Sequence, residues 1–311
     1  MAPIYQVALV LRSAIFLIPW LIHLFIADIL LSALLPLFAI APTLAYDLSS
    51  AIAEPVWNGI QSILTQRNGA KIIVSGANDL PPGESAIVIS NHVEWADFYS
   101  IQALALQKSM LGRCRYFAKQ QLKWVPFLGW GLWAMGMPLV SRNWMTDQRE
   151  MDRVFKGVQE RKWPMWLISF SEATRYTPSK RLSAEKWCEA NNRKLGKHVL
   201  YPRVKGFCAS VRQLRTTPHV QAVYDLTIAY AHHPQGRSSQ FQRPPTFWQT
   251  LSQPKLDQQR TFYVHVTRHA IVDLPHSDAE LAQWLEDRWV EKGERLEILR
   301  QKLVKGVSWE A

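Results

Sequence analysis

The sequence predicts an α/β protein: a mixed sheet flanked by helices, preceded by an N-terminal helical pair that inserts into a membrane. Two observations support this prediction. Residues 13–46 form an apolar run with a single charged residue, Asp28, and such a run is too apolar for a surface helix of a soluble protein. Beyond residue 70, short β-rich runs alternate with helical stretches, as in a sheet covered by helices. We therefore assign residues 1–60 to a membrane-anchoring segment and residues 61–311 to one globular domain.

The apolar run is too long for one straight membrane span. As a single helix, its 34 residues would measure about 50 Å, whereas the hydrocarbon core of a bilayer is about 30 Å thick. Asp28 and the prolines Pro19, Pro36 and Pro42 offer places to break, so we predict two short helices that form a hairpin or a partly inserted pair. A cleaved signal peptide is the alternative, but the run is longer than such a peptide and lacks a basic start.

The charge is unevenly distributed along the chain. The net charge is +11, yet residues 1–60 hold one basic and three acidic residues, which leaves 35 basic against 22 acidic residues in the rest. Positive-inside reasoning places this basic body on the cytosolic side. A basic body favours polyanionic partners: nucleic acid, an anionic membrane surface, or a phosphorylated substrate such as CoA or a phospholipid. The three cysteines show no CxxC or Cys/His cluster, so no disulfide framework or zinc site is indicated.

The expected elements after residue 70 follow from local patterns. Strands are predicted at 71–75, 86–90, 115–118, 137–141, 165–170, 220–230 and 261–267. Helices are predicted at 97–109, 145–160 and 278–303. Residues 231–260 are rich in Pro, Gln and Ser and are expected to form a long excursion before the last strand. Several tryptophans after Lys119 could form an interfacial belt or pack in the core: Trp124, Trp130, Trp133 and Trp144.

The first candidate catalytic motif is NHVEWAD, residues 91–97, directly after the predicted strand 86–90. Helical residues five apart do not share a face, so His92 and Asp97 can meet only if His92 lies in a turn and Asp97 in the first helical turn. There Asp97 can orient His92 as a general base for a substrate hydroxyl. A structural or helix-capping histidine is the alternative. His92 and Glu94 also begin a zinc-deaminase signature, but its cysteine motif is missing from the sequence.

Two further motifs place charged residues at strand ends. SFSEATR, residues 169–175, supplies Glu172 and Arg175 at a turn that suits an anion. GMPLVSR, residues 136–142, ends in Arg142, and Lys119 lies shortly before it. Such basic side chains can converge on one phosphate, each charge-assisted contact contributing about 1.5 to 3 kcal/mol. The alternative is that these are ordinary surface charges, paired with one another or with solvent.

The order NHVEWAD, GMPLVSR, FSEATR and LYPRVKGF resembles the four successive blocks of the 1-acylglycerol-3-phosphate acyltransferase family, also called lysophospholipid acyltransferases. Their usual forms are NHxxxxD, GxxFxxR, FPEGTR and a Pro-containing hydrophobic block. Most of the chain after residue 70 is similar to the branch of eukaryotic lysophosphatidic acid and lysocardiolipin acyltransferases. Ser171 and Ala173 replace the Pro and Gly of the third block. If that Gly has a positive φ, Ala173 is strained by about 1 kcal/mol.

The resemblance implies an O-acyltransferase that transfers a fatty acyl group from acyl-CoA to the free hydroxyl of lysophosphatidic acid, giving phosphatidic acid. It implies that His92 deprotonates the hydroxyl, that Asp97 orients His92, and that no covalent acyl-enzyme forms. It also assigns binding of the acceptor, chiefly of its phosphate, to Lys119, Arg142, Glu172, Thr174 and Arg175. Acyl-CoA as co-substrate, a lysophospholipid and the endoplasmic reticulum bilayer are the expected partners, with the catalytic domain in the cytosol and no metal or other cofactor.

Two alternatives remain at this point. Within enzymes, the acceptor can instead be lysophosphatidylinositol or lysocardiolipin. From another class, the chain can be a catalytically idle membrane protein that binds phosphorylated lipids through the same basic residues. The intact His92 and Asp97 favour an enzyme. Nucleic-acid binding is disfavoured, because the sequence resembles no DNA- or RNA-reading motif and its apolar N-terminal run is strong.

Overall fold

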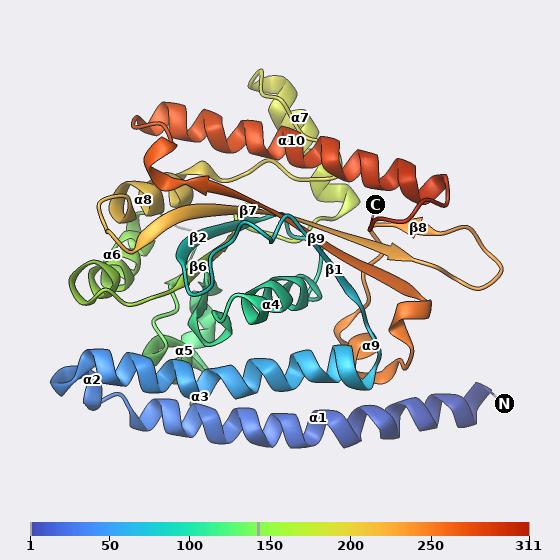
Figure 1. Ribbon diagram of the computed structural model, residues 1–311, viewed down its shortest axis with the longest axis horizontal. Coiled ribbons are helices and arrows are strands. Elements are labelled where there is room, and N and C mark those ends of the chain that lie inside the picture. The colour runs from blue at the N-terminus through green and yellow to red at the C-terminus, as the bar shows by residue number, and fades with distance from the viewer. Residues whose placement is uncertain (1, 142–143, 311) are drawn as a thin grey trace.

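The computed structural model describes residues 2–141 and 144–310. A twisted sheet lies in the middle of the molecule, with the N-terminal helices on one side and the long C-terminal helix on the other (Figure 1). The seven-stranded sheet has the order β1-β9-β7-β2-β6-β3, with β8 paired to β7. The predicted fold class, a mixed sheet flanked by helices and preceded by an apolar helical segment, is confirmed.

The strands carry both parallel and antiparallel pairs. Strands β7, β2, β6 and β3 are parallel to one another, β9 is antiparallel to β7, and β1 is parallel to β9. The bounds in the main sheet are β1 Ile72–Ser75, β2 Ser85–Ser90, β3 Cys114–Tyr116, β6 Trp166–Phe170, β7 Val220–His232, β8 Gln240–Phe241 and β9 Arg260–Ala270. All six positions of β2 are buried, as expected for a parallel strand covered on both faces.

The predicted strand 137–141 does not join the main sheet. Its core, β5 (Leu139–Val140), pairs with β4 (Ala118–Lys119) in a separate two-stranded sheet. The predicted strand 115–118 is divided accordingly between β3 and β4. Pro138 has no N–H to donate to a ladder, but its carbonyl accepts a bond from the N–H of Ala118 at 3.0 Å. The chain that leaves β3 therefore continues as β4, outside the main sheet.

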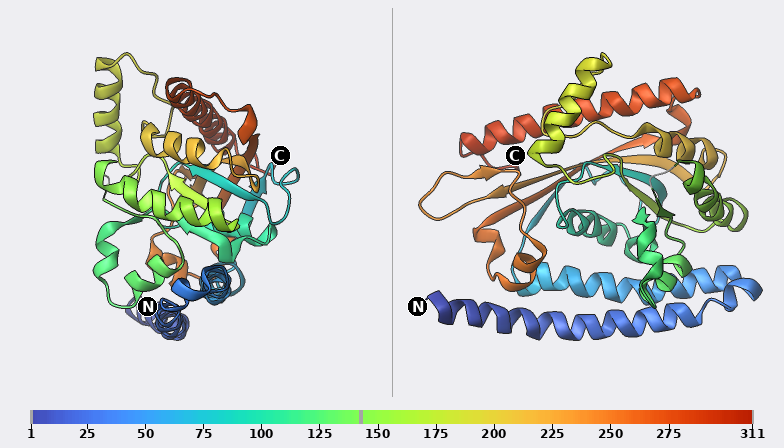
Figure 2. Two further views of the ribbon diagram at one scale, coloured as in Figure 1. Left: turned by 90° about the vertical axis from the view of Figure 1, so that its left-hand side faces the viewer. Right: turned by 180° about the vertical axis from the view of Figure 1, so that it is seen from behind.

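Helices cover both faces of the sheet (Figure 2). Helix α4 lies between the sheet and the N-terminal helices, whereas α6, α8 and α10 cover the opposite face. The α-helices after the N-terminal segment are α4 Asp97–Gln107, α5 Leu128–Ala134, α6 Trp144–Arg161, α7 Pro178–Ala190, α8 Val204–Leu214, α9 Phe247–Ser252 and α10 Asp278–Val304. Shorter turns are a π-helix at Ile63–Arg67 and 3₁₀ helices at Leu111–Arg113, Gln120–Trp124, Leu256–Gln258 and Ile271–Asp273. The predicted excursion before β9 therefore contains β8 and α9.

The N-terminal segment folds as two antiparallel helices, and only two of the predicted break points, Pro36 and Pro42, lie at the turn between them. Helix α1 runs unbroken through Ala2–Ala33, past Pro19 and Asp28. The chain turns at Pro36 and α2 (Leu37–Ile40) before α3 (Pro42–Ser62). The predicted helical pair is thus present, but its first helix is longer than expected because Pro19 and Asp28 do not break it. The segment Ile4–Ala33 of α1 is long and apolar enough to cross a membrane, and most of its residues are exposed.

Helix α3 joins the N-terminal segment to the core of the domain. Ala53 and Ile60 belong to the same hydrophobic cluster as the sheet residues Val88 and Val264. The Tyr46 hydroxyl donates to the carbonyl of Pro164 at 2.8 Å. Helix α1, in contrast, leaves a row of large apolar side chains exposed, including Ile4, Tyr5, Leu11, Ile15, Ile18, Ile22, Phe25 and Ile26. The predicted boundary between residues 60 and 61 stays a prediction.

The three cysteines are buried and unpaired. Burial raises the pKa of Cys114 to about 12 and that of Cys208 to about 11. Burial also raises the pKa of Cys188. All three thiols are therefore protonated near neutral pH.

Candidate active site

Two of the sequence motifs leave the sheet at the same edge. Strands β2 and β6 are parallel neighbours, and their last residues, Ser90 and Phe170, face each other in register. The segments that follow must therefore start side by side, because parallel strands have their carboxyl ends at one edge. The N–H of Tyr176 donates to the carbonyl of His92 at 2.8 Å and ties the two segments together.

His92 and Asp97 meet as the sequence predicted. His92 lies in the turn after β2, Asp97 is the first residue of α4, and His92 Nδ1 is 2.7 Å from Asp97 Oδ2. The imidazole also stacks on the Phe170 ring, with centroids 4.0 Å apart. The hydrogen bond and the stacked ring together fix the orientation of the imidazole.

Three further donors hold the Asp97 carboxylate, which is fully buried. Oδ2 accepts the N–H groups of Val93 at 2.6 Å and Glu94 at 3.1 Å. Oδ1 accepts the hydroxyl of Tyr230 at 2.7 Å. Burial, and then the charge of Asp97, raises the pKa of Tyr230 well above its ordinary value, so the phenol stays a donor. The carboxylate is thereby held rigidly beneath the imidazole.

This arrangement leaves the other imidazole nitrogen available. An ionised carboxylate only accepts hydrogen bonds, so we assign the proton to Nδ1 and a free lone pair to Nε2. Nε2 has no hydrogen-bond partner among the residues that the structure describes, and the His92 side chain is 16% exposed. The pair is thus arranged to take a proton from a group that enters from solvent.

Asn91 anchors the turn that carries His92. Its side-chain N–H donates to the carbonyl of Ile228 at 2.9 Å, and its Oδ1 accepts the N–H of Ile228 at 2.8 Å. Pairing between β2 and β7 ends at Ser90 and Leu226, so the Asn91 amide continues the ladder by one step. The start of the His92 turn is therefore fixed to β7.

Glu172 lies beneath the neighbouring turn and is buried. Its Oε1 accepts the indole N–H of Trp289, on α10, at 3.2 Å. Burial raises the pKa of Glu172 to about 8, a rise that Trp289 and the backbone N–H groups of Leu200 and His92 oppose. The carboxyl thus faces α10 and the underside of the His92 turn. Its expected contact with an acceptor stays a prediction.

The turn after β6 has the strained geometry that the sequence suggested. Ala173 has φ +56°, in the left-handed region where an alanine costs about 1 kcal/mol more than a glycine. Its N–H donates to the carbonyl of Phe170 at 2.8 Å. The hydroxyl of Thr174 accepts from Lys180 Nζ at 2.6 Å, and Lys180 also donates to the carbonyl of Arg175 at 3.1 Å. Lys180 is a cation at this site that no sequence pattern indicated.

Arg175 forms an ion pair with Glu94, from the His92 turn. A pocket of about 440 Å³ lies beside this pair and is lined by Glu94, Trp95, Arg175, Thr246 and Phe247. Two predicted motifs and the segment before β9 thus meet at one opening, which includes two residues of the turn that carries His92. We call this opening the Arg175 pocket.

Of the two remaining predicted cations, Lys119 lies on the small sheet. Lys119 is the last residue of β4, the strand that follows β3 in the chain. It pairs in register with Val140 on β5. Its side chain is exposed. Arg142, two residues beyond β5, lies outside the described residues. The structure therefore brings together His92, Asp97, Thr174 and Arg175, with Glu172 beneath them.

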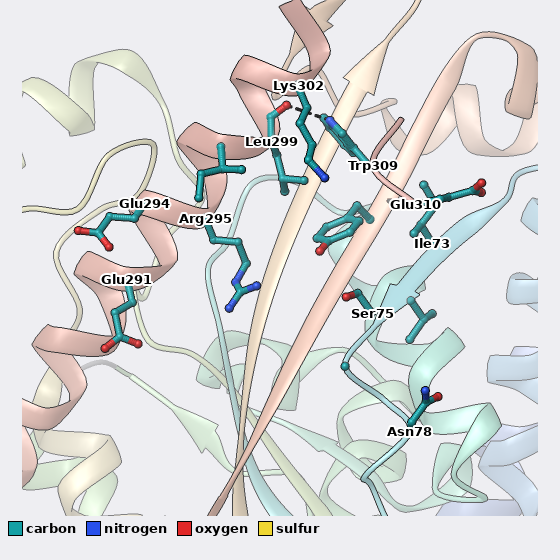
Figure 3. Close-up of a pocket in the computed structure, with 14 residues that line it drawn as sticks. Ile73, Ser75, Asn78, Glu291, Glu294, Arg295, Leu299, Lys302, Trp309 and Glu310 are labelled. Atoms are coloured by element: carbon teal, nitrogen blue, oxygen red, sulfur yellow. Dashed lines mark hydrogen bonds between the residues drawn. The ribbon is translucent and has the colours of Figure 1, made fainter. Parts of the chain in front are cut away.

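A larger cavity, of about 970 Å³, lies elsewhere, between β1 and α10 (Figure 3). Its lining includes Ser75, Arg295, Lys302 and Trp309. Strands β9 and β7 separate β1 from β2 in the sheet, and His92 is not among the residues that line this cavity. Among the described residues, no group of three or more His, Cys, Asp or Glu side chains could hold a metal ion.

Comparisons with known proteins agree on one family. The family model described as Acyltransferase matches residues 71–231, and the model described as Acyltransferase C-terminus matches residues 256–302. The chain is 29% identical to 1-acyl-sn-glycerol-3-phosphate acyltransferase 2 of Arabidopsis thaliana, over 79% of this chain and 60% of that protein. It is 28% identical to lysocardiolipin acyltransferase 1 of Danio rerio, over 86% and 66%. It is 31% identical to 1-acyl-sn-glycerol-3-phosphate acyltransferase epsilon of Mus musculus, over 71% and 59%.

The chain spans about 60% of the length of the first of these curated relatives. Among solved structures, the crystal structure of the 1-acyl-sn-glycerophosphate (LPA) acyltransferase PlsC from Thermotoga maritima is similar, with a TM-score of 0.47 and 15% identity over 88% of this chain and 97% of that one. The Acyltransferase model covers more than half of the 311 residues and includes both motifs of the site. This chain therefore belongs to the acyltransferase family.

Proposed function

We propose that the protein is an O-acyltransferase that transfers a fatty acyl group from acyl-CoA to the free hydroxyl of lysophosphatidic acid, giving phosphatidic acid. The observation that carries this proposal is the His92–Asp97 pair, with 2.7 Å between Nδ1 and Oδ2 and an open Nε2. The names of the plant and mouse relatives support the acceptor. The domain formed by residues 61–311 would hold the whole catalytic site.

In the proposed reaction, His92 Nε2 takes the proton of the acceptor hydroxyl while the hydroxyl oxygen attacks the thioester carbonyl carbon. The new C–O bond forms, the C–S bond breaks, and the proton on the imidazolium passes to the leaving thiolate. Asp97 holds the correct tautomer and stabilises the imidazolium that forms. The chain itself supplies the base and its orienting group, so the proposal requires no metal and no cofactor besides the co-substrate acyl-CoA.

The acceptor's phosphate would bind at the Arg175 pocket. Arg175 lines this pocket. Lys180 donates hydrogen bonds to the Thr174 hydroxyl and to the Arg175 carbonyl, so it lies against the turn after β6. A guanidinium suits a phosphate because it can donate two parallel hydrogen bonds. Lys119 would contribute further positive charge from the small sheet, and we propose that Arg142 contributes positive charge as well.

We also propose that the protein is held at the endoplasmic reticulum membrane with its catalytic domain in the cytosol. The exposed apolar row on α1 supports bilayer contact. The side chains of Trp124, Trp130 and Trp133 are exposed as well, which suits an interfacial position. The side chain of Trp144 lies outside the described part of the chain.

The decisive test uses the purified full-length protein with one acyl-CoA and a panel of acceptors. The panel contains lysophosphatidic acid, lysophosphatidylinositol, lysocardiolipin and monoacylglycerol, and released CoA thiol is measured. The highest kcat/KM with lysophosphatidic acid supports the proposal. Preference for a phosphodiester favours the second candidate, a lysophosphatidylinositol or lysocardiolipin acyltransferase, which the name of the Danio rerio relative supports. If no acceptor leads to release of CoA thiol, the result favours a catalytically idle protein that binds phosphorylated lipids.

The mechanism has its own test. His92→Ala should keep the fold but lower kcat by about 10² to 10⁴-fold, the usual contribution of one general base. His198→Ala is a matched control, because His198 also pairs with a carboxylate, Glu297, at 2.7 Å but lies outside the site. The control should keep most of its turnover. A His92→Ala enzyme with more than half of the wild-type kcat would exclude His92 as the base.

A further inference from the structure

Glu94 lies on the same short turn as His92 and directs its carboxylate at Arg175. Its own N–H donates to Asp97 Oδ2 at 3.1 Å, so its backbone is part of the catalytic turn. Its Oε1 accepts the N–H of Trp95 at 2.9 Å and also accepts from Arg175 Nη1. The guanidinium proposed to bind the acceptor's phosphate is therefore already paired within the protein.

The pair controls the charge of the Arg175 pocket. Glu94 and Arg175 are its charged lining residues, and the others are Trp95, Thr246 and Phe247. With both charges present the lining is formally neutral, whereas without the carboxylate it would be +1. An anion that enters thus meets a guanidinium whose charge is already compensated.

The pair is also accessible. The Arg175 side chain is 54% exposed and that of Glu94 is 30% exposed. Exposed ion pairs contribute little to stability, because water solvates the separated charges well. A phosphate that carries more charge than a carboxylate can therefore displace Glu94 from Arg175 without disturbing the fold.

We infer that Glu94 is a specificity-determining residue, which competes with the acceptor's phosphate for Arg175. This inference rests on the proposed function and goes beyond it. The same ion pair must open before any phosphate can reach the Arg175 guanidinium, so Glu94 weakens binding of every phosphate-bearing acceptor. An acceptor without a phosphate has no contact with the guanidinium to lose and is not weakened. Glu94 thereby lowers the preference of the site for phosphate-bearing over phosphate-free acceptors.

The test is the isosteric, neutral variant Glu94→Gln in the full-length protein. KM for lysophosphatidic acid should fall about three- to tenfold, whereas KM for monoacylglycerol, which carries no phosphate, should stay within twofold. The ratio of the two kcat/KM values should therefore rise by about three- to tenfold, while KM for acyl-CoA changes less than twofold. Binding of radiolabelled lysophosphatidic acid in mixed micelles should tighten by the same factor, and this measurement requires no turnover.

Two controls separate a local effect from a general change of charge. Asp278→Asn also removes one negative charge from an exposed pair, with Arg212 at 3.2 Å, but lies outside the pocket, so acceptor KM should stay within twofold. In an Arg175→Ala background, Glu94→Gln should no longer lower KM or tighten binding.

A higher KM or weaker binding in Glu94→Gln would overturn the inference, because it would mean that Glu94 positions Arg175 for the phosphate. An equal gain in the Arg175→Ala background would overturn it as well. Failure of the proposed function is a separate result: the wild-type protein would then release no CoA thiol with any acceptor, whereas the binding comparison would still decide the role of Glu94.

Discussion

Replacing Glu172 by Gln should change how the stability of the protein depends on pH. The carboxyl is buried under the site, and burial raises its pKa from 4.5 to about 8. In the unfolded chain the group ionises at its ordinary value. Between the two values the unfolded chain has lost the proton and the folded protein retains it, so stability falls as pH rises. The loss begins near pH 4.5 and ends near pH 8.

The magnitude follows from the two pKa values. One unit of difference corresponds to about 1.4 kcal/mol, so the interval from 4.5 to about 8 gives a loss of about 5 kcal/mol. Glutamine has the same shape and no charge, so Glu172→Gln removes this term. For a protein of this size 1 kcal/mol shifts Tm by about 2 °C. Relative to the variant, the wild-type Tm should fall by about 10 °C across the interval.

Thermal unfolding in detergent between pH 4.5 and 8.5 measures this difference, and other titrating groups cancel in the comparison. Glu160→Gln is the control, because Glu160 is exposed on α6 and its ion pair with Lys156 is long, at 3.9 Å. Its Tm should follow that of the wild type at every pH. If the curves of Glu172→Gln and wild type run parallel, burial does not hold the Glu172 proton and the reasoning is wrong.

Three further predictions concern other parts of the structure. Tyr230→Phe removes one charge-assisted donor from Asp97 and should lower kcat about tenfold, the equivalent of about 1.5 kcal/mol; steady-state assays with unchanged activity would contradict the role of the phenol. Ala173→Gly relieves the strain at φ +56° and should raise Tm by about 2 °C, measured by the same thermal unfolding; a lower Tm would argue against strain there. If α1 inserts its exposed apolar side into the bilayer, the protein should stay in the membrane pellet through high-salt and alkaline carbonate washes, because apolar burial is insensitive to screening; release by salt alone would contradict insertion.

The sequence could predict those parts of the site that local spacing determines. Asp97 is five residues after His92, and a strand, turn and helix start is the arrangement that lets them meet. The two motifs each follow a buried strand, and parallel strands with a shared edge then bring them together. The left-handed conformation of Ala173 followed from a glycine expected at that position. In each case the information lies within a few residues.

The rest depends on contacts between distant segments. Tyr230 is 133 residues from Asp97 and Trp289 is 117 from Glu172, and neither residue stands in a pattern that marks a partner. The pairing of Glu94 with Arg175 likewise depends on how two loops meet. The unbroken α1 has a similar cause: Asp28 is buried against α5, where Gly131 leaves room for its carboxylate. A charge that looked like a break point in sequence is thus covered in the fold.

Because the three native thiols are buried, a cysteine introduced at the surface can be labelled selectively. Thiolates, not thiols, react with maleimides and spin labels, and the pKa values of Cys114 and Cys208 are raised to about 12 and 11. A cysteine introduced at Trp124, which is 78% exposed, would react far faster than these native residues. Nitroxides attached at this position and along α1 would then report, by their contact with oxygen or with a water-soluble quencher, how deeply each part of the surface sits in lipid. The measurement can be made on the protein with all of its native cysteines in place.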